Sequence, residues 1–220
     1  MSTSEKKLID NENVKSLILD TAFDLYVVNG PEKTSIRSIA KKIGYSPTTI
    51  YLYYRNKDAI FHEIQKVAIK RLYSQINSVE TNADPFIKLE NMVCVYIDFA
   101  IENPHLYEMM FVLGPLLDVP ELDFDWGNFK ETTDLFIDAI ESCLNAKAII
   151  HTDIQTLWLF FWSSLHGMLS LYLSKRLVKV YQCDQTELRQ EIKPVLNHFI
   201  KILLPEQMSV SNKIYSLMRI

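Results

Sequence analysis

Residues 33–57, KTSIRSIAKKIGYSPTTIYLYYRNK, constrain the fold most, because they combine two helix signals with a turn signal. Apolar residues at positions i, i+3, i+4 and i+7 predict the first helix, and these are Ile36, Ile39, Ala40 and Ile43. Gly44 follows where a left-handed C-cap belongs, and Ser46-Pro47 supplies an N-cap and a first helical residue. The second helix is expected to run to about Tyr54. The stretch therefore predicts a compact helix-turn-helix.

The second helix has an unusual outer side for a helix that only faces water. At about 100° per residue, Ile50 and Tyr54 fall on the inner side. The opposite side carries Thr48, Tyr51 and Leu52. The same stretch contains six Lys or Arg and no Asp or Glu, although the whole chain has a formal charge of −4. These features indicate a recognition helix facing a polyanion; the alternative is a solvated hairpin whose cations only aid solubility.

The stretch resembles the N-terminal DNA-binding domain of the tetracycline-repressor (TetR) family of transcriptional regulators. The resemblance covers roughly the first 65 residues and rests on an ordered pattern of Thr34, Ile39, Ala40, Ile43, Gly44, Ser46, Thr49, Ile50, Tyr51, Tyr53, Tyr54, Lys57 and Asp58. Two positions depart from the commonest family pattern: Thr48, often glycine, and Tyr54, often phenylalanine. The branched Thr48 side chain obscures any inference about the DNA sequence that is bound.

Two groups of residues are predicted to contact DNA. The candidates for the major groove are Arg37, Thr48, Tyr51 and Leu52. Leu52 can pack on a thymine methyl group, and Arg37 can bind a guanine through two hydrogen bonds. The candidates for phosphate contacts are Ser35, Thr49, Tyr53 and Lys57. One short helix reads few base pairs, so we expect a homodimer on a palindromic operator in double-stranded DNA.

Composition limits the other functions. The 220 residues are 48% apolar, which is enough for a substantial core, and net charge is +3 over residues 1–70 but −7 over residues 71–220. Cys94, Cys143 and Cys183 have no metal-ligand spacing, so we expect reduced core thiols, no metal and no cofactor. The polar N-terminus has no signal-peptide core, which predicts a cytoplasmic protein. No nucleophile, phosphate-loop or paired-carboxylate motif suggests an enzyme.

The periodicity along the chain predicts an all-α protein in four parts. These are an N-terminal helix-turn-helix domain (1–56), a connecting helix (57–80), a C-terminal helical ligand-binding and dimerisation bundle (81–205) and a tail (206–220) that we cannot place. Residues 1–12 are expected to be a frayed arm before a covering helix from about Val14 to Asn29. Further helices are expected at 85–102, 105–113, 129–144, 156–173 and 188–203.

Residues 156–173, TLWLFFWSSLHGMLSLYL, contain no charged side chain when histidine is neutral. This length must be weighed as a membrane span. Its three serines, its glycine and its histidine instead favour a helix buried on two sides, with no membrane contact. By resemblance, the last two long helices pair with their copies to form the dimer.

The segment Trp162-Ser163-Ser164-Leu165-His166-Gly167 resembles the Trp-x-x-x-His-Gly signature of one subclass of TetR-like C-terminal domains. A small, mainly apolar ligand is predicted to bind there among Tyr96, Phe99, Tyr107, Met110, Trp126, Trp158, Trp162 and His166. His166 would then supply one orienting hydrogen bond. The alternative is that His166 is a core histidine with its hydrogen bonds satisfied and that the aromatic residues only fill the bundle.

Together these patterns predict a ligand-responsive transcription factor, most often a repressor in this family, that a small-molecule effector releases from DNA. The resemblance further implies that tilt of the connecting helix communicates ligand occupancy. The alternative function is a DNA-bound structural or cell-division adaptor of the same fold that binds a protein partner and has no small-molecule inducer.

Overall fold

The computed structural model describes most of the chain. The described residues are 3–80, 84–111, 127–147, 153–182, 184, 186–187, 190–195 and 198, with side chains from residue 11 onward except at 127, 147 and 181. Every regular element within them is a helix, which confirms the predicted all-α class. Trp126, Cys183 and the tail at 206–220 lie outside the described residues.

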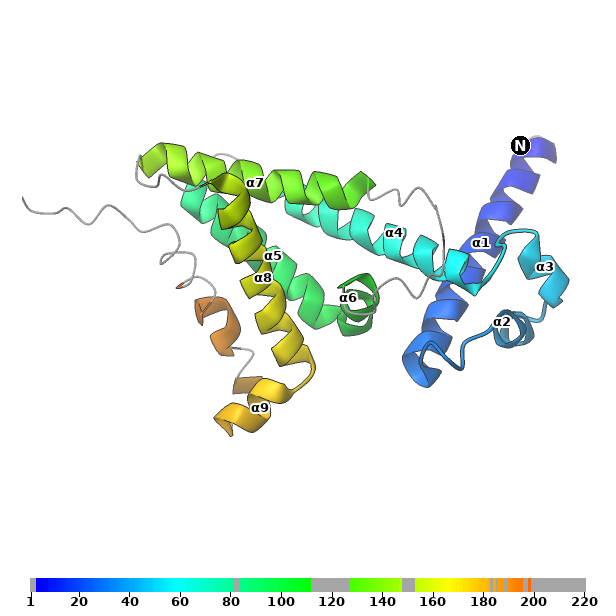
Figure 1. Ribbon diagram of the computed structural model, residues 1–220. Helices are drawn as coiled ribbons and strands as arrows, with labels where there is room; N and C mark the ends of the chain where they lie inside the picture. The colour runs from blue at the N-terminus through cyan, green and yellow to red at the C-terminus, as the bar shows by residue number, and fades with distance from the viewer. Residues whose placement is uncertain are drawn as a thin grey trace, which may run out of the picture. The chain divides into compact units, whose positions relative to one another are not determined.

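The chain divides into two compact units, whose helices are labelled in Figure 1. Unit 1 consists of residues Met1–Arg71 and His105–Trp126, and unit 2 of Leu72–Pro104 and Gly127–Ile220. Helix α4 (Lys57–Asn77) begins in unit 1 and ends in unit 2. The units therefore share one continuous helix.

Helix α2 (Ile36–Ile43) has a defined cap at each end. Ser35 Oγ accepts a hydrogen bond from Ser38 N–H (3.1 Å), and Ser38 Oγ accepts one from Ser35 N–H (2.9 Å), which completes a capping box. Gly44 takes a φ of 75°, and its N–H donates to Ala40 O. Because this left-handed conformation favours glycine, α2 ends where the sequence predicts.

Helix α3 (Pro47–Tyr51) begins as predicted and ends earlier than predicted. Ser46 Oγ accepts from Thr49 N–H at 3.1 Å, and Pro47 occupies the first helical position. The expected end at Tyr54 is wrong: α3 ends at Tyr51, and the chain then forms a turn in which Leu52 N–H donates to Thr49 O and both Tyr53 N–H and Tyr54 N–H donate to Ile50 O. This tighter turn has no side-chain pattern that separates it from a regular helix.

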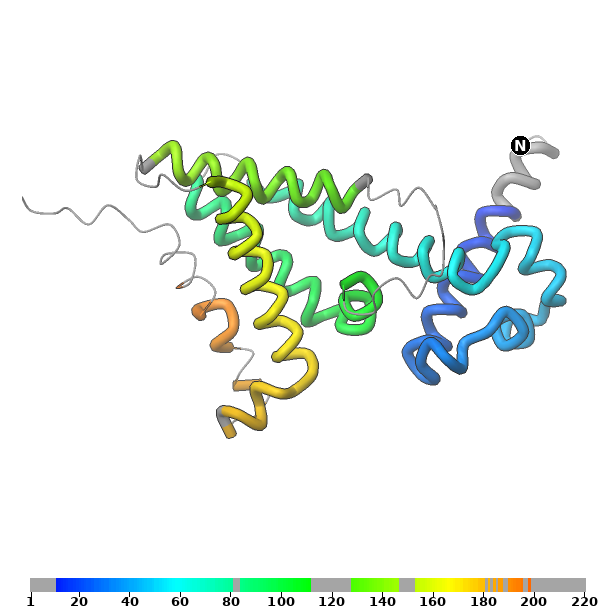
Figure 2. The backbone as a smooth tube through the Cα atoms, in the orientation of Figure 1, coloured from blue at the N-terminus to red at the C-terminus, as the bar shows by residue number. Residues whose placement is uncertain are grey.

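One apolar core joins the helices of unit 1, whose path can be followed in Figure 2. Helix α1 (Thr3–Asn29) crosses α2, and helix α6 (Pro104–Phe111) adds Met109 to the same core. The buried members of the core are Ile18, Ala22, Tyr26, Ile36, Ile39, Ala40, Ile50, Ile60, Phe61, Ile64 and Met109. The predicted three-helix arrangement is thus extended by α6.

The expected frayed arm at residues 1–12 is wrong, because α1 already begins at Thr3. Residues 3–13, TSEKKLIDNEN, contain neither proline nor glycine, so nothing in them interrupts a helix. The sequence prediction began the helix at its first apolar-periodic residue, and a polar helical extension carries no such periodicity.

Unit 2 is a bundle built on helix α5 (Pro85–Glu102). Helices α7 (Gly127–Lys147) and α8 (Ile154–Leu173) pack against α5, and α9 (Arg176–Tyr181) packs against α8. Asp84 and Asp153 cap α5 and α8 through hydrogen bonds from backbone N–H groups. The buried core includes Leu89, Met92, Val93, Tyr96, Ile97, Phe136, Ile140, Phe161, Leu165 and Ile192.

Helix α8 is buried along one side and exposed along another. Leu157, Phe161, Leu165, Leu169 and Tyr172 face the bundle, whereas Leu159, Phe160 and Leu171 are 63%, 55% and 40% exposed. Within the described residues, no helix has the length and hydropathy needed to cross a membrane. Of the predicted helix at 188–203, residues 190–195 are helical and Ile192 is buried; the rest is described only in part.

The geometry at Gly44 predicts the effect of adding a side chain there. A Cβ at this position would meet no atom within 4 Å, so only backbone strain opposes it. Gly44→Ala should lower the free energy of unfolding by about 1 kcal/mol, measured by urea titration. Gly44→Asn, which tolerates the left-handed region better, should lose less. Equal stability of Gly44→Ala and the parent would contradict the assigned C-cap.

Candidate nucleic-acid interface and aromatic cluster

The four side chains predicted for the major groove lie on the surface of unit 1. Arg37 and Thr48 are exposed, and Tyr51 and Leu52 are 56% and 80% exposed. Ile50, between them in α3, is completely buried. Burial of Ile50 therefore turns the opposite side of α3 outward. We call Arg37, Thr48, Tyr51 and Leu52 the reading face.

Of the four side chains predicted for phosphate contacts, Ser35 is exposed, and Thr49, Tyr53 and Lys57 are partly buried. Ser35 Oγ accepts from Ser38 N–H, and Thr49 Oγ1 lies 2.9 Å from Ser46 Oγ. Tyr53 packs against the core of unit 1. Ser35 and Thr49 thus contribute to the helix caps, and Tyr53 contributes to the core, so a phosphate contact would be an additional role for each. Contact of either predicted group with DNA remains a prediction.

The cations of the helix-turn-helix divide into two groups. Lys42 Nζ lies 3.1 Å from Asp24 Oδ2, and Lys57 Nζ donates to Pro31 O at 2.9 Å. The remaining four are exposed and form no ion pair or side-chain hydrogen bond within the described part of the chain: Lys33, Arg37, Lys41 and Arg55. These four supply positive charge that is available to a polyanion.

The sequence prediction left out two exposed side chains at this surface. Tyr45 is 42% exposed and stands between the C-cap of α2 and the N-cap of α3. Its position in the turn was visible in the sequence, but periodicity assigns no face to a residue between two helices. Lys41 was also left out, although it lies one turn beyond Arg37 in α2 and is therefore on the same side.

Helix α6 is bonded to two other helices of unit 1. Tyr26 Oη in α1 donates to Glu108 Oε2 at 3.4 Å, and Gln65 Nε2 in α4 donates to Met109 O at 2.6 Å. Burial raises the pKa of the Tyr26 hydroxyl, and the Glu108 carboxylate raises it further. Tyr26 therefore stays protonated and can donate. These contacts fix α6 to α1 and α4, which share the core of unit 1 with α2 and α3.

Unit 2 contains an aromatic cluster formed by three helices. Trp162 in α8 is central, with its ring centre 5.6 Å from Tyr96 in α5, 5.9 Å from Phe129 in α7 and 4.0 Å from His166. Trp158 continues the cluster at 5.0 Å from Trp162. The members of the aromatic cluster are Tyr96, Phe129, Phe136, Trp158, Phe161, Trp162 and His166.

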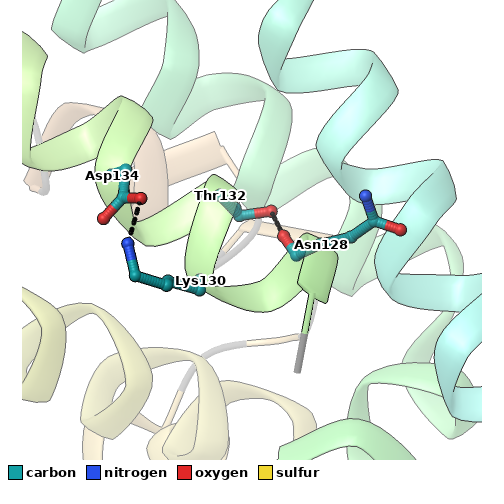
Figure 3. Close-up of polar contacts among 4 residues, drawn as sticks. All are labelled: Asn128, Lys130, Thr132 and Asp134. Atoms are coloured by element: carbon teal, nitrogen blue, oxygen red, sulfur yellow. Dashed lines mark hydrogen bonds and ion pairs between the residues drawn. The ribbon is translucent and has the colours of Figure 1, made fainter. Parts of the chain in front are cut away.

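The first turns of α7 are held by local hydrogen bonds, as Figure 3 shows. Thr132 Oγ1 donates to Asn128 O at 2.6 Å, and Lys130 Nζ lies 2.6 Å from Asp134 Oδ2. Thr132 is buried, so its hydroxyl needs this acceptor. The contacts stabilise the turn from which Phe129 reaches Trp162.

His166 has a defined polar partner. Its Nε2 lies 2.9 Å from Tyr96 Oη, and the Trp162 ring packs edge-on against it. Burial lowers the pKa of His166 to about 4, so its imidazole is neutral near pH 7. In this pair a neutral histidine and a phenol satisfy each other within an apolar site. This hydrogen bond is the one expected if His166 is a core histidine with its hydrogen bonds satisfied rather than a ligand-binding residue.

The predicted ligand-binding residues are only partly brought together. Tyr96, Trp158, Trp162 and His166 meet in the aromatic cluster, and Phe99 is buried in α5 of the same unit. Tyr107 and Met110 are buried in α6 and belong to unit 1. Phe129, Phe136 and Phe161 join the cluster although the prediction omitted them. The signal for Phe161 was its place three residues after Trp158; the α7 residues had no comparable signal.

Two of the three cysteines lie among the described residues. Cys143 is buried and Cys94 is partly buried, and burial raises the pKa of Cys94. Among the described residues, no three side chains of His, Cys, Asp or Glu are grouped so as to hold a metal ion.

Two family models match the chain. One describes bacterial regulatory proteins of the tetR family and matches residues 18–64. The other describes a tetracyclin repressor-like C-terminal domain and matches residues 89–192. The first match contains α2 and α3. The second contains every member of the aromatic cluster, from Tyr96 to His166.

Relatives and solved structures agree with this match. YuxN, an uncharacterized HTH-type transcriptional regulator of Bacillus subtilis, is 22% identical over 85% of this chain and 63% of its own length. YobS of the same organism is 27% identical over 43% of this chain and 49% of its own length. The chain thus spans less than two thirds of either relative. The TetR family transcriptional regulator PfmR of Thermus thermophilus has a similar fold, with a TM-score of 0.64 and 17% identity over 86% of this chain and 94% of PfmR.

The lowered pKa of His166 predicts a pH-dependent stability. Its pKa is about 4 in the folded protein against an ordinary value of 6.5, so the unfolded chain binds the extra proton between these values. The free energy of unfolding should fall as the pH drops from 6.5 to 4, by on the order of 3 kcal/mol from this residue. Urea titration should show that the free energy of unfolding of His166→Gln falls by about 3 kcal/mol less than that of the parent over the same pH range.

His105→Gln is the matched control, because His105 is exposed and lies in unit 1. This variant should lose stability with falling pH as the parent does. An identical pH dependence in the parent and in His166→Gln would contradict the assigned burial of a neutral imidazole.

Proposed function

The chain belongs to the tetR family of bacterial regulatory proteins, and we propose that it is a repressor that a small, mainly apolar ligand releases from its operator. The observation that most supports binding to DNA is the exposed side of α3 together with the exposed cations of the helix-turn-helix, Lys33, Arg37, Lys41 and Arg55. A helix-turn-helix regulator of this family binds DNA, and its proteins typically dimerise.

The reading face enters the major groove. Tyr51 and Leu52 meet base edges, and Arg37 binds a guanine. Ser35, Thr49 and Tyr53 contact flanking phosphates through hydroxyl groups. Lys57 already bonds to Pro31 O, so its contact with phosphate uses the remaining N–H donors of the ammonium group.

The operator is a palindrome read by a homodimer. Helix α3 has five residues, and one such helix covers few base pairs. Two copies related by a two-fold axis read half-sites that are about one helical turn, or a multiple of it, apart. Two helices of each subunit pair with their copies in the dimer: α8, through its exposed side with Leu159, Phe160 and Leu171, and the predicted helix at 188–203. Burying these three apolar side chains favours association.

The ligand binds at the aromatic cluster of unit 2. The cluster is apolar apart from its hydroxyl, indole and imidazole groups, which suits a mainly apolar molecule with one polar group. A ligand that replaces the Tyr96–His166 hydrogen bond with its own would keep both side chains satisfied. The Trp-x-x-x-His-Gly resemblance supports this placement.

The DNA-binding face and the ligand site are coupled through helices α4 and α6. Helix α4 runs from unit 1 into unit 2, and α6, bonded to α1 and α4, follows directly after α5. A ligand that binds better to the arrangement of low DNA affinity shifts the population by its differential affinity, typically about 1–3 kcal/mol. Because its partner is DNA, the protein acts in the cytoplasm, and it acts without catalysis.

Replacing Tyr51 tests the reading face. Tyr51→Ala should reduce the preference for operator over random DNA by about tenfold, because one base contact contributes about 1–3 kcal/mol of discrimination. Fluorescence anisotropy with operator fragments selected from the source genome measures both affinities. Val180→Ala removes a side chain of similar exposure from unit 2 and should leave the preference unchanged. An unchanged preference in Tyr51→Ala would remove α3 from the interface.

Replacing Leu159 tests the dimer. Leu159→Glu places a charge on the exposed side of α8, so sedimentation at micromolar concentration should find monomers and operator affinity should fall by more than about a hundredfold. Val180→Glu adds the same charge on α9 and should remain dimeric. A dimeric Leu159→Glu variant with parental operator affinity would show that another surface pairs the subunits.

A further inference from the structure

Lys57 makes two contacts inside unit 1. It is the first residue of α4, and its ammonium group donates a hydrogen bond to Pro31 O at 2.9 Å, across 26 residues of sequence. The same Nζ lies 5.7 Å from the ring centre of Phe61, one turn further along α4, and Phe61 is buried. The ring face attracts the cation and holds it near the carbonyl.

The acceptor belongs to the turn that joins α1 to α2. Gly30 begins this turn with a φ of 78°, and Thr34 ends it with its side chain 1% exposed. Thr34 Oγ1 donates to Gly30 O at 2.9 Å, and Thr34 N–H donates to Pro31 O at 3.3 Å. Pro31 O thus accepts from both Thr34 and Lys57. The bond from Lys57 is charge-assisted and therefore the stronger type.

The turn determines where α2 begins. Ser35, directly after Thr34, caps α2, and Arg37 of the reading face follows two residues later. We infer that Lys57 is a positioning residue, which bonds the turn at residues 30–34 to the first turn of α4 and thereby fixes the start of α2 and the place of Arg37. This inference rests on the proposed DNA-binding function.

The bond also connects the reading face to the helix shared by both units. Helix α4 continues from Lys57 to Asn77 in unit 2. A displacement of the first turn of α4 therefore pulls on Pro31 or breaks the bond to it. Either result changes the position of the α2 N-terminus, in addition to any role of Lys57 on phosphate.

The test compares full-length Lys57→Met with the parent and with Arg55→Met. Methionine keeps most of the side-chain stem and removes the donor and the charge. Without DNA, the Thr34 amide of Lys57→Met should exchange its hydrogen at least about tenfold faster than in the parent, and operator affinity should fall by a similar factor. Arg55 is an exposed cation two residues earlier, so Arg55→Met should leave Thr34 exchange unchanged.

Salt dependence separates this role from a phosphate contact. Loss of one phosphate contact lowers the slope of log affinity against log salt by about 0.9. A lower slope in Lys57→Met with parental Thr34 exchange would overturn the inference and leave a phosphate contact alone. Failure of the proposed DNA-binding function gives a different result from failure of this inference. In that case the unaltered protein would not prefer its selected operator over random DNA, whatever the exchange rate of the Thr34 amide.

A measurement on the unaltered protein keeps the test valid if Lys57→Met does not fold. In protein with 15N-labelled lysine, the ammonium signal of Lys57 should persist without DNA, because a bonded ammonium exchanges protons slowly. The signals of exposed Lys33 and Lys41 should be lost to solvent exchange. Lys57→Arg, which keeps the charge, identifies the signal by its disappearance. Exchange of the Lys57 ammonium as fast as that of Lys33 would overturn the inference.

Discussion

Burial of Ile50 in the core of unit 1 is the contact on which the DNA-binding surface depends. Helix α3 has only five residues, so one side chain decides which side of it faces inward. The Ser46 cap starts the helix in the correct phase, and Ile50 then packs among the core residues of α1 and α2. Tyr51 and Leu52 are exposed as a consequence, although a tyrosine and a leucine would ordinarily be drawn into a core.

The charges of unit 1 serve two purposes that composition alone does not separate. Lys42 and Lys57 have partners within the unit: Lys42 pairs with Asp24 of α1, and Lys57 bonds to Pro31 in the turn between α1 and α2. Arg37 of the reading face is exposed, as are Lys33, Lys41 and Arg55. An exposed ion pair such as Lys42–Asp24 contributes little to stability. Lys42 therefore contributes little to the stability of the fold, whereas the four exposed cations are available to a polyanion partner.

Much of the fold followed from residues with a single structural meaning. Gly44, Ser46 and Pro47 located the turn, and Pro85 located the start of α5. The polar start of α1 and the tight turn after Tyr51 were missed, because neither leaves a periodic apolar pattern. The contacts of Lys57 and Tyr26 join residues 26 and 82 positions apart, and such pairs appear only when the chain is folded.

The aromatic cluster was predictable in part for the same reason. Trp158, Trp162 and His166 share one side of α8 at helical spacing, so the sequence places them together. Their partners in α5 and α7 depend on how those helices pack. A hydrogen bond to His166 could therefore be anticipated, because a largely enclosed imidazole needs a polar partner, but Tyr96 could not be named as that partner.

Photo-crosslinking maps the central contact most directly. The selected operator, with 5-bromouracil in place of thymine in each half-site, would be irradiated with the protein, and the crosslinked peptide identified by mass spectrometry. The account predicts crosslinks to the peptide that contains Tyr51 and Leu52, at equivalent positions in both half-sites. Crosslinks confined to unit 2, or to unit 1 residues outside the reading face and its flanks, would contradict it.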